Sequence, residues 1–187
     1  MIETIKSNIE RIVEQACAAD TNIFGYDIWT HHILKVVENT KRLAPHFGAD
    51  PEIVELAALL HDYASIKDKA LYEHHHIHSP IEAEKLLKRF GYPEEKTEAV
   101  KHAIATHRAS VIVERRSAEG ECLANADAMS HIEQVSSLLY LAYIHHGMGI
   151  DEGKTWVKAK LRRSWEKMRE DVQDLVRDTY KATLKIL

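Results

Sequence analysis

The sequence predicts an all-α fold, a single-domain helical bundle. Its 187 residues suffice for one domain with a substantial core and are short for two. Only 7 glycines and 4 prolines occur, and they lie between long stretches in which apolar residues recur at intervals of three and four. No alternating strand pattern of useful length competes with these stretches, apart from the segment Ser110–Glu114.

The breaks delimit seven expected helical segments: Glu3–Ala19, Asp27–Phe47, Pro51–Tyr63, Pro80–Phe90, Pro93–Arg108, Glu119–His146 and Asp151–Ile186, the last of them broken. The first segment carries an apolar stripe made of Ile5, Ile9, Ile12 and Ala16. The second presents one face made of His32, Val36, Asn39 and Leu43. Both patterns have the period of a helix that packs one face on a core.

Helix-start signals support the later segments. Pro51 and Pro93 occupy first-turn positions, with Asp50 before the former and glutamates just inside both. The segment after Pro93 has a stripe made of Val100, Ile104 and His107. In the segment from Glu119, Leu123 and Asp127 share a stripe. The stretch Ala64–Ser79 has no clear periodicity, and we expect a loop there.

Composition narrows the class of protein. No apolar stretch approaches the length of a membrane span, and the N-terminus lacks the basic start and apolar block of a secretory signal. Cys17 and Cys122 lie far apart without CxxC spacing, which argues against a disulfide framework or a thiolate zinc site and favours a cytoplasmic location. The net charge of −4 gives no general drive toward nucleic acid. From Asp151 onward the chain is mildly basic, which we interpret as a solvated helix face.

The composition also stands out for its 13 histidines. The apolar run LAALL leads directly into His61 and Asp62, two side chains that are costly to bury unpaired. A metal held against this helix end would explain the pair, and it would need further ligands from other helices. His31 or His32 upstream and Asp127 downstream supply them. The alternatives are a helix-end histidine bonded to a carboxylate and a helix-interior aspartate bonded to the backbone.

These residues resemble the HD-domain superfamily of metal-dependent phosphohydrolases. The order His32, His61-Asp62, Asp127 is similar to the family's ligand order, and HILKV is similar to its H-x-x-[RK]-V helix. The LAALLHD and ADAM segments are similar to the family's apolar run into HD and to its last aspartate helix. The resemblance favours His32 over His31. It covers about residues 27–131, which would form the metal-binding core with the helices of 151–187 packed on it.

The resemblance implies a metal held by the four residues just named. Some members bind two metals with two further histidines, and His78 and His107 match those positions; Asp62 would then bridge the ions. For each of these two histidines the alternative is a supporting or surface role. We interpret the consecutive His74, His75 and His76 mainly as loop residues near the mouth of the site, with His75 or Glu73 as a remote candidate for a substrate contact.

Hydrolysis of a phosphoester, of a nucleotide or another small phosphorylated molecule, is the function that the resemblance implies. Imidazole and carboxylate ligands without cysteine suit one or two ions of Mn, Fe, Ni, Co or Mg. Such ions lower the pKa of a bound water and offset phosphoryl charge. Asp62 would orient the water, and Lys67, Arg108 and Lys35 are candidate cations for catalysis or substrate binding.

Two alternatives remain at this point. Some HD-domain proteins with four histidines and two aspartates hold two irons and act as oxygenases, and the ligand count does not distinguish them from hydrolases. A non-catalytic module that senses a metal or nucleotide is the other. We expect no membrane and no nucleic-acid partner, and the sequence leaves a monomer and a homo-oligomer both open. It does not name the substrate.

Overall fold

The computed structural model describes residues 2–108 and 114–187, and within them the chain is helical with no strand. The segment Ser110–Glu114 lies outside the described residues except for Glu114. The elements in chain order are α1 (Ile2–Cys17), η1 (Trp29–Ile33), α2 (Leu34–Phe47), α3 (Pro51–Leu60), α4 (Tyr63–Lys67), η2 (Lys69–His74), α5 (His75–Arg89), α6 (Glu94–Thr106), α7 (Ala118–Glu133), α8 (Val135–Tyr140), η3 (Leu141–His145), α9 (Ile150–Lys167) and α10 (Glu170–Ile186). The predicted all-α fold is confirmed.

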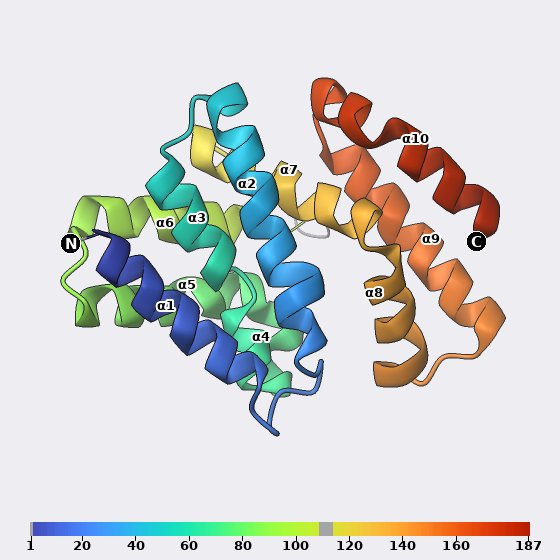
Figure 1. Ribbon diagram of the computed structural model, residues 1–187, viewed down its shortest axis with the longest axis horizontal. Helices are drawn as coiled ribbons and strands as arrows, with labels where there is room; N and C mark the ends of the chain where they lie inside the picture. The colour runs from blue at the N-terminus through green and yellow to red at the C-terminus, as the bar shows by residue number, and fades with distance from the viewer. Residues whose placement is uncertain (1, 109–113) are drawn as a thin grey trace.

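Helix α7 runs through the middle of the molecule (Figure 1). It packs against α2, α3 and α6 on one side and against α9 and α10 on the other. Every residue from Cys122 to Ser130 is buried, as expected for a helix with neighbours on all sides. The alanines in this segment allow the neighbours to approach closely, so Asp127 lies near the centre of the protein.

Local signals explain the helix ends that lead to the site. The Asp50 carboxylate accepts a hydrogen bond of 2.9 Å from the Glu52 backbone N–H, and Pro51 fills the first helical position of α3. Helix α2 ends at Gly48, whose φ of 66° lies in the left-handed region that glycine adopts without strain. These two signals set the direction in which α3 carries its apolar residues toward His61.

Three helix boundaries differ by more than two residues from those predicted, and His74, His75 and His76, predicted as loop residues, lie in η2 and α5. Helix α3 ends at Leu60, before the predicted end at Tyr63. Helix α5 begins at His75 and contains Pro80, which was the predicted start. Proline inside a helix removes a backbone donor, but burial of residues on both sides of it in α5 favours the helix there. The predicted helix Glu119–His146 is divided at Gln134, whose backbone is not helical.

The expected break in the last segment falls between α9 and α10, where Met168 has an extended backbone. Helix α9 lies along α7 (Figure 1), and its buried stripe contains Val157, Leu161 and Ser164. The side chains beside that stripe therefore face the region around Asp127. No helix in the described part of the chain is long and apolar enough to cross a membrane.

Candidate metal centre

His61 and Asp62 occupy the short break between α3 and α4. Leu60 and His61 are both fully buried, so the apolar run anchors the helix end and fixes the two polar residues that follow it. The His61 Nδ1–H donates to the Ala58 carbonyl at 2.7 Å. This bond directs Nε2 toward the Asp62 carboxylate, whose Oδ2 lies 3.4 Å away.

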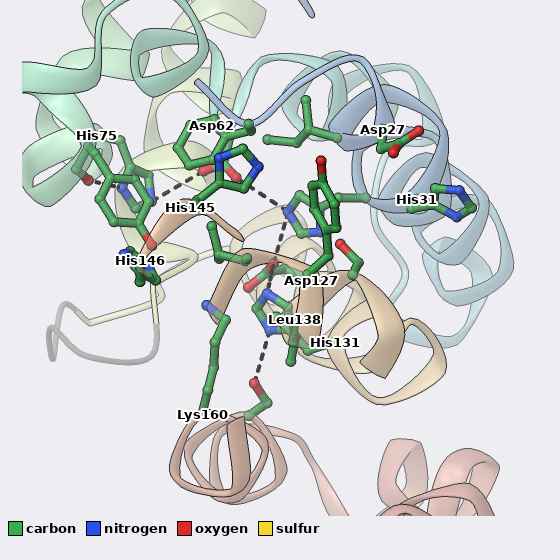
Figure 2. Close-up of a pocket in the computed structure, with 18 of the residues that line it drawn as sticks. Asp27, His31, Asp62, His75, Asp127, His131, Leu138, His145, His146 and Lys160 are labelled. Carbon is green, nitrogen blue, oxygen red and sulfur yellow. Dashed lines mark hydrogen bonds and ion pairs between the residues drawn. The ribbon is translucent and has the colours of Figure 1, made fainter. Parts of the chain in front are cut away.

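His32 and Asp127 meet this pair from other helices. The His32 Nε2 lies 3.1 Å from His61 Nε2, 3.3 Å from Asp62 Oδ2 and 3.7 Å from Asp127 Oδ1. Its ring comes from the π-helical turn η1, while Asp127 comes from the buried middle of α7. His31, the neighbour in the sequence, lines the pocket farther out, beside Asp27 (Figure 2). The structure thus brings together the four residues at the centre of the sequence prediction.

Two further histidines lie on the other side of Asp62. The His75 Nε2 is 3.3 Å from Asp62 Oδ1 and 3.3 Å from His107 Nε2. Asp62 therefore has one oxygen facing His32 and His61 and the other facing His75. His107 caps the end of α6 and is buried, as its stripe predicted.

His78, the predicted partner of His107, lies elsewhere. It is partly exposed and is not among the residues that line the pocket, whereas His75 is buried and does line it. The reason is the earlier start of α5, which puts His75 on the buried stripe formed by Ser79, Ala83 and Leu87. Extending that four-residue spacing backward through Pro80 would have identified His75 from the sequence.

The hydrogen bonds around the imidazoles test whether a metal fits. His75 Nδ1 lies 2.7 Å from the Tyr72 carbonyl and His107 Nδ1 lies 2.6 Å from the Ile104 carbonyl. Because a carbonyl only accepts, each Nδ1 carries a proton, so Nε2 is the atom through which each ring can offer a lone pair. Two such lone pairs face each other at 3.3 Å, an arrangement that favours a cation between or beside them. The donor set fits a metal.

The charges in the centre also favour a bound metal. Burial disfavours a charged His61, but the Asp62 carboxylate raises the pKa of His61 to about 9. Burial also opposes the charged form of Asp62, yet the His61 and His75 imidazoles hold the pKa of Asp62 well below its usual range. Burial, followed by repulsion from the same two rings, lowers the pKa of His107. The centre therefore attracts positive charge while keeping His107 neutral and able to bind a metal.

A buried lysine that the sequence prediction missed supports two of these residues. Lys167 of α9 donates to Asp127 Oδ2 at 2.7 Å and to the His107 carbonyl at 2.8 Å. Its side chain is 3% exposed, so this ion pair is screened little by solvent. Asp127 keeps Oδ1 directed toward His32, and Lys167 thus fixes the orientation of the carboxylate.

The three predicted cations have different surroundings. Arg108 lines the pocket, where its guanidinium contacts the Glu73 backbone carbonyl and lies 3.3 Å from His76 Nδ1. Lys67 is paired with Glu82, and Lys35 lies 3.1 Å from Glu38. Neither lysine is among the residues that line the pocket.

Above the centre lies a cavity of about 490 Å³. Its walls carry aromatic and imidazole rings, among them Phe24, Tyr72, Tyr140, His145, His146 and Trp156. The His146 and Trp156 rings are 5.2 Å apart between centroids. Helix α9 adds Lys160, Arg163 and Ser164, none of which the sequence prediction identified. The described part of the pocket thus joins a polar floor to an aromatic outer wall.

Comparison with known proteins identifies the family of the chain. The family model of the HD domain matches residues 29–132. The crystal structure of Bacillus subtilis YpgQ has a TM-score of 0.75 at 22% identity over 99% of this chain and 92% of that one. YpgQ in complex with ADP gives 0.68 at 20% identity, over 100% and 93% of the two chains.

An HD-superfamily hydrolase from Bacillus thuringiensis gives a TM-score of 0.71 at 18% identity, over 100% of this chain and 94% of the other. A search of curated proteins returns no match. At these identities the structural similarities establish the fold, and the family model, which spans more than half of the chain, establishes the relationship. The protein belongs to the HD-domain family.

Proposed function

We propose that the protein is a metal-dependent phosphohydrolase that cleaves a phosphoester of a nucleotide or another small phosphorylated molecule by means of metal-activated water. The observation that carries the proposal is the convergence of four imidazoles on Asp62 and Asp127 at the floor of a pocket. Histidines that bind no ligand would have no reason to converge in this way, and burying these polar groups without a ligand costs free energy. The same floor opens onto a cavity large enough for a small molecule.

The proposed ligand sets follow the two sides of Asp62. One set consists of His32, His61, Asp62 and Asp127, as the sequence predicted. The second consists of Asp62, His75 and His107, with His75 in the place given to His78. Nitrogen and oxygen donors without thiolate suit Mn, Fe, Ni, Co or Mg, as one ion or two.

The chain's own residues divide the work of hydrolysis. A bound divalent metal supplies a water of lowered pKa and a Lewis acid for the phosphoryl oxygens. Asp62 would help to hold the metal and orient the water that it activates. Arg108, on the pocket wall, binds a phosphoryl oxygen and offsets its negative charge. The aromatic wall excludes water from the remainder of the substrate.

A nucleotide is the small phosphorylated molecule that the aromatic wall favours. Trp156 and His146, which line the cavity, present rings on which a nucleobase can stack. The protein of similar fold from Bacillus subtilis has been crystallised in complex with ADP. These two observations support the nucleotide over a phosphorylated sugar.

A panel of phosphoesters and nucleotides assayed with Mn, Mg, Ni and Fe, with and without oxygen, tests the proposal. We expect metal-dependent release of phosphate or a phosphorylated product under anaerobic conditions, and loss of it with EDTA. Turnover that strictly requires oxygen would instead establish the di-iron oxygenase, whose four histidines and two aspartates this centre also supplies. Binding without any turnover would establish a sensing module.

Replacing His75 with alanine separates the two candidate second sets. In His75→Ala we expect the metal content to fall by one ion per chain if two are bound, and activity to fall by at least about tenfold, because a direct contact of Asp62 and His107 is lost. His78→Ala is the matched control and should retain both. Metal analysis by mass spectrometry, together with initial rates, measures the effect. The reverse pattern would return the ligand role to His78.

A further inference from the structure

We propose that Lys160 and Arg163 of α9 form an anion subsite for a phosphoryl group of the substrate other than the one that is attacked at the metal centre. The subsite rests on the proposed function, since it assigns a second phosphoryl group to the substrate of the same pocket. It lies outside residues 29–132, the part of the chain that matches the HD family model.

The order of side chains along α9 locates the subsite. Lys167 contacts Asp127, and one turn earlier Ser164 Oγ lies 3.0 Å from His131 Nδ1. Lys160 is one more turn away on the same face, and Trp156 follows at the outer wall. Since one helical turn rises about 5.4 Å, Lys160 lies between the metal centre and the aromatic wall. Figure 2 shows its side chain extending from α9 into the pocket.

The charge of Lys160 has no carboxylate partner in the described part of the chain. Lys167 is neutralised by Asp127, whereas no carboxylate oxygen lies within 4 Å of Lys160 Nζ or of the Arg163 guanidinium among the ion pairs of the structure. Both residues line the pocket. The Trp156 ring is the group that faces Lys160 Nζ, 6.0 Å from the ring centroid. Two cations three positions apart on a helix repel each other, so an anion between them is favourable.

Desolvation adds to this argument. Burial, only partly offset by attraction to Asp127 and Asp62, lowers the pKa of Lys160. A partly desolvated ammonium without a partner destabilises the folded protein, and a phosphoryl dianion would remove that cost on binding. The site thus favours a ligand with a negative charge at this depth of the pocket.

A substrate that spans this pocket has three parts. The aromatic end lies against Trp156 and His146, the phosphoryl group that is attacked lies over Asp62, and a further phosphoryl group lies at Lys160. A nucleoside diphosphate or triphosphate has this order of groups, whereas a free nucleoside has no phosphoryl group for the subsite. Lys160 is therefore expected to discriminate between these ligands.

The test compares the binding of adenosine with that of the methylene analogue of ADP, in which the link between the phosphorus atoms resists hydrolysis. Both are titrated by calorimetry into the Mg-loaded full chain. In Lys160→Met we expect the analogue to bind at least about tenfold more weakly, because a charge-assisted hydrogen bond is lost, and adenosine, which carries no phosphoryl group, to bind within about twofold of wild type. Arg163→Met should weaken binding of the analogue in the same direction.

Arg162→Met is the matched control, since it removes the same charge from an exposed neighbour on α9 that does not line the pocket. It should bind both ligands as wild type does. Metal content and melting temperature should be unchanged or higher in Lys160→Met, because no ion pair is broken. A loss of metal would show instead that Lys160 supports the centre, and would overturn the subsite.

Equal binding of the analogue by Lys160→Met and Arg162→Met would overturn the proposal, as would an equal loss for adenosine and the analogue. The measurement needs no turnover. If the protein hydrolyses no phosphoester but only Lys160→Met loses the analogue, the subsite stands and the proposed function fails. If hydrolysis of nucleoside diphosphates is the same in Lys160→Met and wild type, the subsite fails and the proposed function stands.

Discussion

An Asp62→Ala variant is expected to contain almost no metal and to lose at least about 100-fold of any hydrolytic activity. Replacing a residue that only supports a metal ligand already lowers metal affinity or activity by roughly 10 to 100-fold. Asp62 directly faces the imidazoles of both proposed sets. Its two oxygens lie 3.3 Å from His32 Nε2 and 3.3 Å from His75 Nε2. Removing the carboxylate takes away the ligand that both proposed sets share and leaves His75 and His107 without an anionic partner in their set.

Metal analysis of the purified protein measures this result, with wild type expected to hold about one to two ions per chain. Asp178→Ala removes an exposed aspartate and serves as the matched control. Equal metal in Asp62→Ala and wild type would contradict the assignment of the centre. Activity that survives in His61→Ala would remove the mechanism as a whole.

Replacing Lys167 with methionine is expected to lower the free energy of unfolding of the metal-free protein by about 3 kcal/mol. Asp127 is 7% exposed in its side chain, and the variant leaves this carboxylate without the ammonium that now lies 2.7 Å away. Since typical domains are stable by only about 5 to 15 kcal/mol, the effect is a large fraction of the total. Methionine retains most of the volume, so the cavity term is small.

Added metal should restore part of that loss, because a cation bound to Asp127 neutralises the same charge. Thermal unfolding with EDTA and with Mn measures both effects, and the shift caused by Mn should be larger in Lys167→Met than in wild type. Lys181→Met, which removes an exposed lysine, should behave as wild type. Unchanged stability of metal-free Lys167→Met would contradict the role assigned to this ion pair.

The parts of the site that the sequence predicted are those carried by local patterns. His61 and Asp62 stand at the end of an apolar run, and His32 and Asp127 lie on helices with clear stripes, so their convergence could be inferred from the resemblance. The sequence prediction places His75 in a loop, because Pro80 is typical of the first residue of a helix. Packing of α5 against α4 and α6 extends that helix by more than a turn, an effect that local propensity does not contain.

The contribution of α9 could not be predicted for a different reason. Lys160 and Lys167 belong to a mildly basic amphipathic helix of common type, and nothing in their own neighbourhood distinguishes them from solvated lysines. Only the packing of α9 along α7 shows that Lys167 contacts Asp127 and that Lys160 faces the cavity. The sequence interpretation of this region as a solvated face therefore holds for exposed Arg162 and fails for Lys160.

The proposed ligands all lie at or near helix ends except Asp127, and apart from the adjacent His61 and Asp62 each comes from a different part of the chain. A local opening of η1, α3, α5, α6 or α7 would each separate at least one ligand from the others. Metal binding would then be linked to global rather than local unfolding, so the whole bundle would gain protection against hydrogen exchange as one cooperative unit. The bound metal would therefore stabilise the whole fold, unlike a metal-binding loop that folds independently of its surroundings.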